Sequence, residues 1–141
     1  MVKVFNTASD KSIILIRLLV GLVFLSEGIQ KFLFPETLGV GRFATIGIPY
    51  PYFSAPFTGS FEILCGLFVV FGLYTRLAAI PLLIVILTAI ISTKVPFFMH
   101  KGFWATLHES RTDFCMLLGL IFLLIKGNGR WSLENQVLKK T

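Results

Sequence analysis

The chain has 141 residues, of which 55% are hydrophobic and only 14% are charged, with a formal net charge of +6. Soluble domains carry roughly a quarter of their residues as charges, and a soluble protein this apolar would expose large hydrophobic patches, so composition excludes an ordinary soluble domain. The basic residues lie between and beyond the apolar runs rather than on one polar face, which argues against nucleic-acid binding. A single integral membrane unit surrounded by a lipid bilayer is the remaining class.

The first apolar run, residues 12–34, is about 23 residues long and can span a hydrocarbon core of ~30 Å. Pro35 ends this predicted helix because the residue before a proline resists helical geometry. Residues 35–55 are rich in glycine, proline and aromatic side chains. We expect an ordered loop there on the outer side, with its aromatic residues at the depth of the lipid headgroups.

Two further runs, residues 56–74 and 77–94, predict the second and third helices on either side of a tight turn at Thr75 and Arg76. Pro81 is compatible with the third helix because proline is tolerated in a first helical turn. Residues 95–112 mix polar and aromatic side chains. They predict a loop, part of which could lie flat on the membrane as an amphipathic helix.

The fourth helix, residues 107–126, is the weakest, since its uninterrupted apolar part is only about 12 residues against the ~20 needed to span. It crosses the bilayer only if Glu109, Arg111 and Asp113 face protein or water, and a re-entrant segment is the alternative. With all four spans the fold class is all-α: a polytopic four-transmembrane-helix bundle with an ordered outer loop between the first two helices.

Lysine and arginine counts predict the orientation. If both termini share one side, that side holds seven basic residues and the other side three, Arg42, Lys94 and Lys101. The positive-inside rule then places both termini in the cytoplasm and the protein in the cell (inner) membrane. The seven are Lys3, Lys11, Arg76, Lys126, Arg130, Lys139 and Lys140.

Two stripes of small and charged residues run along the first two predicted helices. At 100° per residue, Arg17, Gly21, Gly28 and Lys31 fall within about 40° of one direction, with Glu27 alongside. The second helix has its own stripe of Gly59, Glu62 and Gly66. Because glycines let helices approach closely in lipid, we expect the two stripes to face each other.

The ionisable residues of the predicted spans converge at one depth. Glu62 lies roughly 9 Å inside the outer membrane boundary at 1.5 Å per residue, and Glu109 and Asp113, four residues apart, share a helix face. We therefore predict an outward-opening polar pocket with ligand-binding or proton-linked residues, and Glu62 is favoured because no basic residue lies within one turn of it. The pocket residues are Glu27, Lys31, Glu62, Glu109 and Asp113.

A structural ion-pair network that fastens the helices is the alternative reading of these charges, and Arg17 and Arg111 are assigned to such a network. Cys65 and Cys115 lie in apolar runs without a C-x-x-C motif, so no thiolate metal site is expected. His100 and His108 lie in one predicted loop and cannot ligate a haem from opposite helices. We expect interfacial histidines and no metal site, with a surface metal site formed by His100, His108 and Glu109 as the lesser alternative.

The sequence resembles the DoxX family of small four-helix membrane proteins over about residues 13–134. The resemblance rests on residues 16–21 (IRLLVG), 27–32 (EGIQKF), 47–49 (GIP), 61–66 (FEILCG), 72–79 (GLYTRLAA), His108-Glu109 and 127–134 (GNGRWSLE). It departs from the family at Asn128 and Glu134, where proline and aspartate are commoner. The resemblance implies the fourth span and a redox-linked membrane subunit, since the family is named after a subunit of quinone-dependent thiosulfate oxidation.

Three functions remain open, and so does whether the protein is itself an enzyme. The first is a small subunit that serves a soluble or membrane oxidoreductase partner and has quinone as its candidate cofactor. The second is a small-molecule or proton-linked transport or binding protein, which with four helices would have to act as a homo-oligomer. The third is a structural assembly subunit without catalysis.

Overall fold

A computed structural model describes residues 12–127 and 129, and this part of the chain is helical without strands, as predicted. Its elements are α1 (Ile13–Leu33), α2 (Val40–Thr45), α3 (Pro51–Phe71), α4 (Thr75–Ala89), the π-helix η2 (Ile90–Lys94), α5 (Val95–Lys101), α6 (Phe103–Glu109) and α7 (Arg111–Lys126). The basic tail and most of the glycine-rich motif at 127–134 lie outside the described residues.

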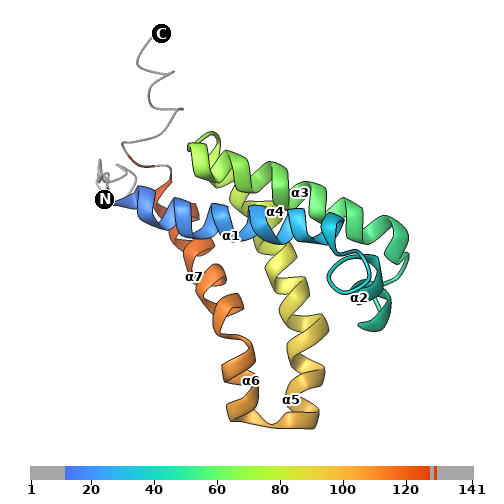
Figure 1. The fold of residues 1–141 in the computed structure, drawn as a ribbon. Helices are drawn as coiled ribbons and strands as arrows, with labels where there is room; N and C mark the ends of the chain where they lie inside the picture. The colour runs from blue at the N-terminus through green and yellow to red at the C-terminus, as the bar shows by residue number, and fades with distance from the viewer. Residues whose placement is uncertain (1–11, 128, 130–141) are drawn as a thin grey trace.

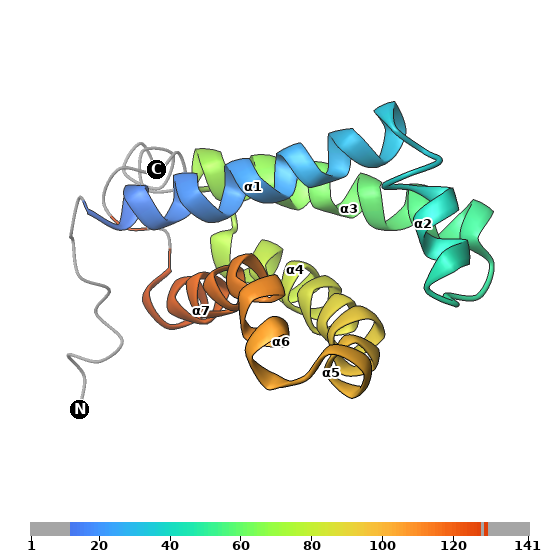
Figure 2. The same ribbon diagram turned by 60° about the horizontal axis from the view of Figure 1, so that its bottom comes forward.

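The helices form two antiparallel hairpins that cross each other (Figure 1). The first hairpin consists of α1 and α3, and the second pairs α4, η2 and α5 with α6 and α7. Seen from below, the hairpins form two layers (Figure 2). The two hairpins meet near the start of α1, the α3–α4 turn and the end of α7, and we call this part of the molecule the closed end. They diverge toward α2 and the α5–α6 turn, which we call the open end. The molecule is therefore V-shaped, unlike a bundle of parallel helices.

The apolar core fills the closed end, where side chains from all four long helices meet. Val20, Val69, Leu82 and Leu120 are fully buried there. Gly119 of α7 lies directly against α1, since a Cβ at this glycine would be 2.5 Å from Cγ2 of Val20. Large apolar side chains also cover the outside of the helices, as expected of surfaces that contact lipid.

Glycines hold α1 and α3 in close contact. A Cβ at Gly28 would lie 2.7 Å from the carbonyl oxygen of Gly59, and a Cβ at Gly66 would lie 3.0 Å from the carbonyl oxygen of Gly21. Any larger side chain at these positions would push the two helices apart. The prediction that the two glycine stripes face each other is confirmed.

The helix boundaries differ from the prediction at the start of α3. Proline at the first position of a helix is well tolerated because its missing N–H has no partner there in any case, and α3 begins at Pro51 instead of Pro56. Helix α2 packs against α3. At the other end of α3, Gly72 adopts a φ of 74°, and the N–H of Leu73 donates to the carbonyl oxygen of Phe68 at 2.9 Å. This glycine cap reverses the chain into α4.

The prediction of a loop over residues 95–112 is wrong, since most of these residues are helical. Helix α4 continues through η2 and α5 to Lys101, and Pro81 lies in its second turn rather than its first. Gly102, with a φ of 87°, separates α5 from α6, and Ser110 separates α6 from α7. The polar residues in this stretch therefore mark exposed helix surface, and the chain reverses only at the glycine.

Three helical segments are long and apolar enough to cross a membrane: Ile13–Leu33, Pro51–Phe71 and Thr75–Lys101. Helix α7 has only 16 residues and is separated from α6 by the break at Ser110. The fourth span of the predicted bundle is thus not among the helices that length and composition identify.

Candidate functional site

A cleft of about 550 Å³ lies between the two hairpins, with walls that include α1, α2, α3, α4, α6 and α7. Seven charged side chains line this space, which we call the polar cleft. They are Glu27, Lys31, Arg42, Glu62, Lys94, Glu109 and Asp113.

The structure brings together all five residues predicted to form an outward-opening pocket. Glu27 and Lys31 come from α1, Glu62 from α3, Glu109 from the last turn of α6, and Asp113 from the first turn of α7. Glu109 and Asp113 both reach the polar cleft although the helix breaks between them at Ser110.

Lys31 and Glu62 form a buried ion pair on the wall made by the first hairpin. The Nζ of Lys31 donates to Oε2 of Glu62 at 2.7 Å, and the two side chains are 11% and 4% exposed. The contact is possible because Gly28 and Gly59 bring the two helices together one turn from the end of α1. Glu62 is therefore paired with a base from another helix, although no basic residue lies within one turn of it along α3.

Lys94 and Asp113 form a second ion pair on the opposite wall. Their Nζ and Oδ2 atoms are 3.4 Å apart, and both side chains are more exposed than those of the first pair. This contact joins the end of η2 to the start of α7. Each hairpin therefore has one ion pair between its own two arms, and both pairs border the polar cleft.

Three charged side chains on the polar cleft are exposed: Glu27, Arg42 and Glu109. Within residues 12–127 none of them has a hydrogen bond or salt bridge from its side chain. Their polar atoms are thus available to a ligand, two carboxylates and one guanidinium on different elements of the walls.

Apolar side chains complete the walls, including Phe24, Phe43, Phe57, Ile48 and Met116. Several hydroxyl groups on the walls are already bonded within their own segments. Ser54 donates to the carbonyl oxygen of Pro49 and Thr88 to that of Ile84. The polar cleft therefore offers flat apolar surfaces beside a few charged groups, an arrangement typical of sites for small organic molecules.

The two arginines assigned to an ion network lie away from this arrangement. Arg17 is buried, and its Nε and Nη2 donate to the carbonyl oxygens of Val69 and Val70 at 3.1 and 2.8 Å. These carbonyls belong to the last turn of α3, where a positive charge also complements the helix dipole. Arg111 is exposed and donates to the carbonyl oxygen of His108. Arg17 thus joins α1 to α3 near the closed end.

Sequence reasoning missed Arg42 and Lys94 as residues of the site. It treated both only as charges that set the membrane orientation. The count of basic residues places both on the outer side, toward which the predicted pocket opens, and this shared side is the signal that could have found them.

His100 lies in α5 and His108 in α6, and both are exposed. Among the described residues, no group of three or more histidine, cysteine, aspartate or glutamate side chains is arranged to hold a metal ion.

Comparison with known proteins places this architecture in a family. The model of the DoxX family matches residues 12–101, which include α1 to α5. The chain is 52% identical over 144 residues to the uncharacterized membrane protein Rv3486 of Mycobacterium tuberculosis, covering 98% of this chain and 88% of the relative. No solved structure matches the chain significantly.

A more distant relative has a name that refers to redox chemistry. The chain is 29% identical over 136 residues to a Bacillus subtilis protein named "Putative oxidoreductase CatD", covering 95% of this chain and 92% of the relative. The similarity extends along nearly the full length of both proteins.

Proposed function

Since the chain belongs to the DoxX family, we propose that it is a small membrane subunit that binds the head group of a quinone in the polar cleft and serves an oxidoreductase partner. The observation that carries this proposal is the cleft itself, where the buried Lys31–Glu62 pair lies beside apolar walls and three exposed charged groups. The name of the Bacillus subtilis relative supports a redox role.

The residues of the polar cleft fit a quinone head group. Its ring needs flat apolar contacts, which Phe24 and Phe57 supply, and its carbonyl oxygens need hydrogen-bond donors. Lys31 and Arg42 are donors on the walls. A bound quinone would supply the redox chemistry, while the chain binds and orients it and the partner delivers the electrons.

The proposal includes the membrane arrangement. With α6 and α7 as a fourth span and both termini in the cytoplasm, the open end faces the outer side. The sequence count, with seven lysine and arginine residues on the side of the termini against three on the other, supports this orientation. Glu109 and Asp113 line the polar cleft, so a fourth span would not expose these two carboxylates to lipid.

The test is mass spectrometry of small molecules retained by the protein after gentle purification from membranes. We expect a quinone in the wild type and at least a tenfold loss, about 1.4 kcal/mol of binding energy, in Glu62→Gln and Arg42→Gln. Arg42 has no partner within the described residues, so its replacement should not disturb folding. Glu36→Gln is the matched control, because Glu36 is exposed and does not line the polar cleft.

The outcomes distinguish the three functions. Retention of a quinone by all variants would contradict the polar cleft as its site. Retention of a different compound, lost in both cleft variants, would favour a small-molecule binding or transport protein. If nothing is retained and Glu62→Gln is degraded while Arg42→Gln is not, the charges serve structure, and the protein is better described as an assembly subunit.

A further inference from the structure

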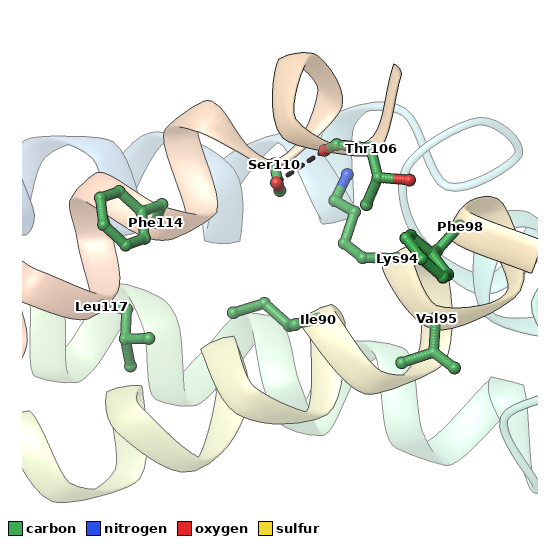
Figure 3. A pocket seen from close by; sticks show the side chains of 8 residues that line it. All are labelled: Ile90, Lys94, Val95, Phe98, Thr106, Ser110, Phe114 and Leu117. Carbon is green, nitrogen blue, oxygen red and sulfur yellow. Dashed lines mark hydrogen bonds between the residues drawn. The ribbon is translucent and has the colours of Figure 1, made fainter. Parts of the chain in front are cut away.

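A second space, of about 390 Å³, lies between the two arms of the second hairpin near the open end. Figure 3 shows Ile90, Val95 and Phe98 on one side of it and Phe114 and Leu117 on the other. The name apolar groove is used below for this space. Its walls come from η2 and α5 on one arm and from α6 and α7 on the other.

The few polar atoms of the apolar groove are already bonded. The hydroxyl of Thr106 donates to the carbonyl oxygen of Gly102 at 2.7 Å, and that of Ser110 donates to the carbonyl oxygen of Thr106 at 2.7 Å. The ammonium of Lys94 is paired with Asp113. An occupant thus meets hydrocarbon surface almost everywhere, which favours a flexible apolar chain over a polar molecule.

Lys94 lines both the apolar groove and the polar cleft. Its ion pair with Asp113 therefore stands where the two spaces adjoin. The methylene stem of a lysine can pack along an apolar chain while its charged end stays in polar surroundings. A ligand with a polar head and a hydrocarbon tail could thus place its head among the charges and its tail beside the stem of Lys94.

The backbone is also unusual at this point. Ile90 and Lys94 are the first and last residues of the π-helix η2, and both line the apolar groove. Single π-helical turns within α-helices are frequently found at functional sites. An irregular turn on the wall where the two spaces adjoin provides a second, independent observation that points to a binding site.

We propose that the apolar groove holds the isoprenoid chain of the quinone whose head group occupies the polar cleft. This inference rests on the proposed function and extends it, because it assigns a separate site to the tail. The two spaces then act as one site for a tailed quinone, with Lys94 at the junction of ring and chain. A ring without a chain would use the polar cleft alone.

The experiment measures equilibrium binding of two probes to the protein in lipid nanodiscs, with empty nanodiscs subtracted. The probes are a menaquinone with its isoprenoid chain and menadione, which has the same ring without the chain. Val95→Trp fills the apolar groove. Ile91→Trp is the control, because Ile91 lies in the same helical segment, is similarly exposed and lines neither space.

We expect Val95→Trp to weaken menaquinone binding by about tenfold, equivalent to about 1.4 kcal/mol, and to leave menadione binding unchanged. Ile91→Trp should change neither. Unchanged menaquinone binding in Val95→Trp, or equal losses for both probes, would overturn the tail site while leaving the proposed function intact. If neither probe binds the wild type, the proposed function fails, and the tail site fails with it.

Discussion

At the polar cleft, Lys31 and Glu62 form a contact that is costly to break because both charges are shielded from water. A buried ion pair contributes little compared with a well-packed apolar pair, but removal of one partner leaves the other charge uncompensated. The two side chains are 11% and 4% exposed, so this argument applies to them. The pair thus adds to the contacts that hold α1 against α3.

We expect Lys31→Met and Glu62→Leu each to lower the free energy of unfolding by about 3–5 kcal/mol, and the double variant to recover most of that loss. Thermal unfolding in detergent measures both effects. Lys94→Met is the control: it breaks the more exposed pair with Asp113, and its effect should be smaller. A double variant as unstable as the single variants would show that the pair is not the reason for the loss.

The sequence could not reveal this pair from spacing along the chain. Glu62 has no base within one turn of its own helix, and its partner lies 31 positions earlier, on α1. Helical angles did place Lys31 and Glu62 on stripes predicted to face each other. Whether the two side chains touch also depends on how α1 and α3 are offset along their axes, and helix packing determines this offset.

At the scale of the helices, the contact between Gly28 and Gly59 determines how closely α1 and α3 approach. A Cβ at Gly28 would lie 2.7 Å from the carbonyl oxygen of Gly59 and 2.8 Å from Cγ1 of Ile63. The backbone oxygen cannot move without displacing α3. Even the smallest side chain at this position must therefore shift one helix away from the other.

We expect Gly28→Ala to reduce stability by about 1–3 kcal/mol, the usual range for overpacking, and to lengthen the Lys31–Glu62 contact. Thermal unfolding measures the first effect, and weaker retention of the ligand reports the second. Ser26→Ala, at an exposed position of the same helix, removes only the hydrogen bond that Gln30 donates to its hydroxyl, so it should change both far less. A Gly28→Ala protein as stable as the wild type would mean that the helices can separate there without cost.

Helix boundaries were predictable where a local signal dominates. The first helix, predicted over 12–34, is observed as Ile13–Leu33, because Pro35 and the end of the apolar run coincide. The prediction failed over 95–112, where polar and aromatic residues resemble a loop by composition although they lie on exposed sides of α5 and α6. Only Gly102, with its φ of 87°, reverses the chain there.

In the molecule as a whole, the five predicted site residues lie together. This could be predicted because the sequence shows both the helix face and the approximate membrane depth of each residue. The crossing of the two hairpins was not readable, since a periodic pattern tells which face of a helix is buried but not the angle at which helices cross. The polar cleft and the apolar groove both depend on that geometry. Their outlines, and the contributions of Arg42 and Lys94, therefore required the structure.

The proposed orientation predicts how single cysteines react in intact cells, in a protein with Cys65 and Cys115 replaced by alanine. Glu36→Cys and Met99→Cys, both exposed near the open end, should be labelled by a membrane-impermeant maleimide. Lys126→Cys, at the last residue of α7, should react only after permeabilisation. Labelling of Lys126→Cys together with Met99→Cys in intact cells would show that α6 and α7 do not cross the membrane.

The location of the two ion pairs also bears on how the chain enters the membrane during synthesis. Lys31 meets Glu62 between the arms of the first hairpin, and Lys94 meets Asp113 between the arms of the second. If α6 and α7 cross the membrane as proposed, each hairpin would enter the bilayer with one pair of opposite charges that can neutralise each other. We would then expect the two hairpins to insert one after the other and to pack at the closed end once both are in the membrane.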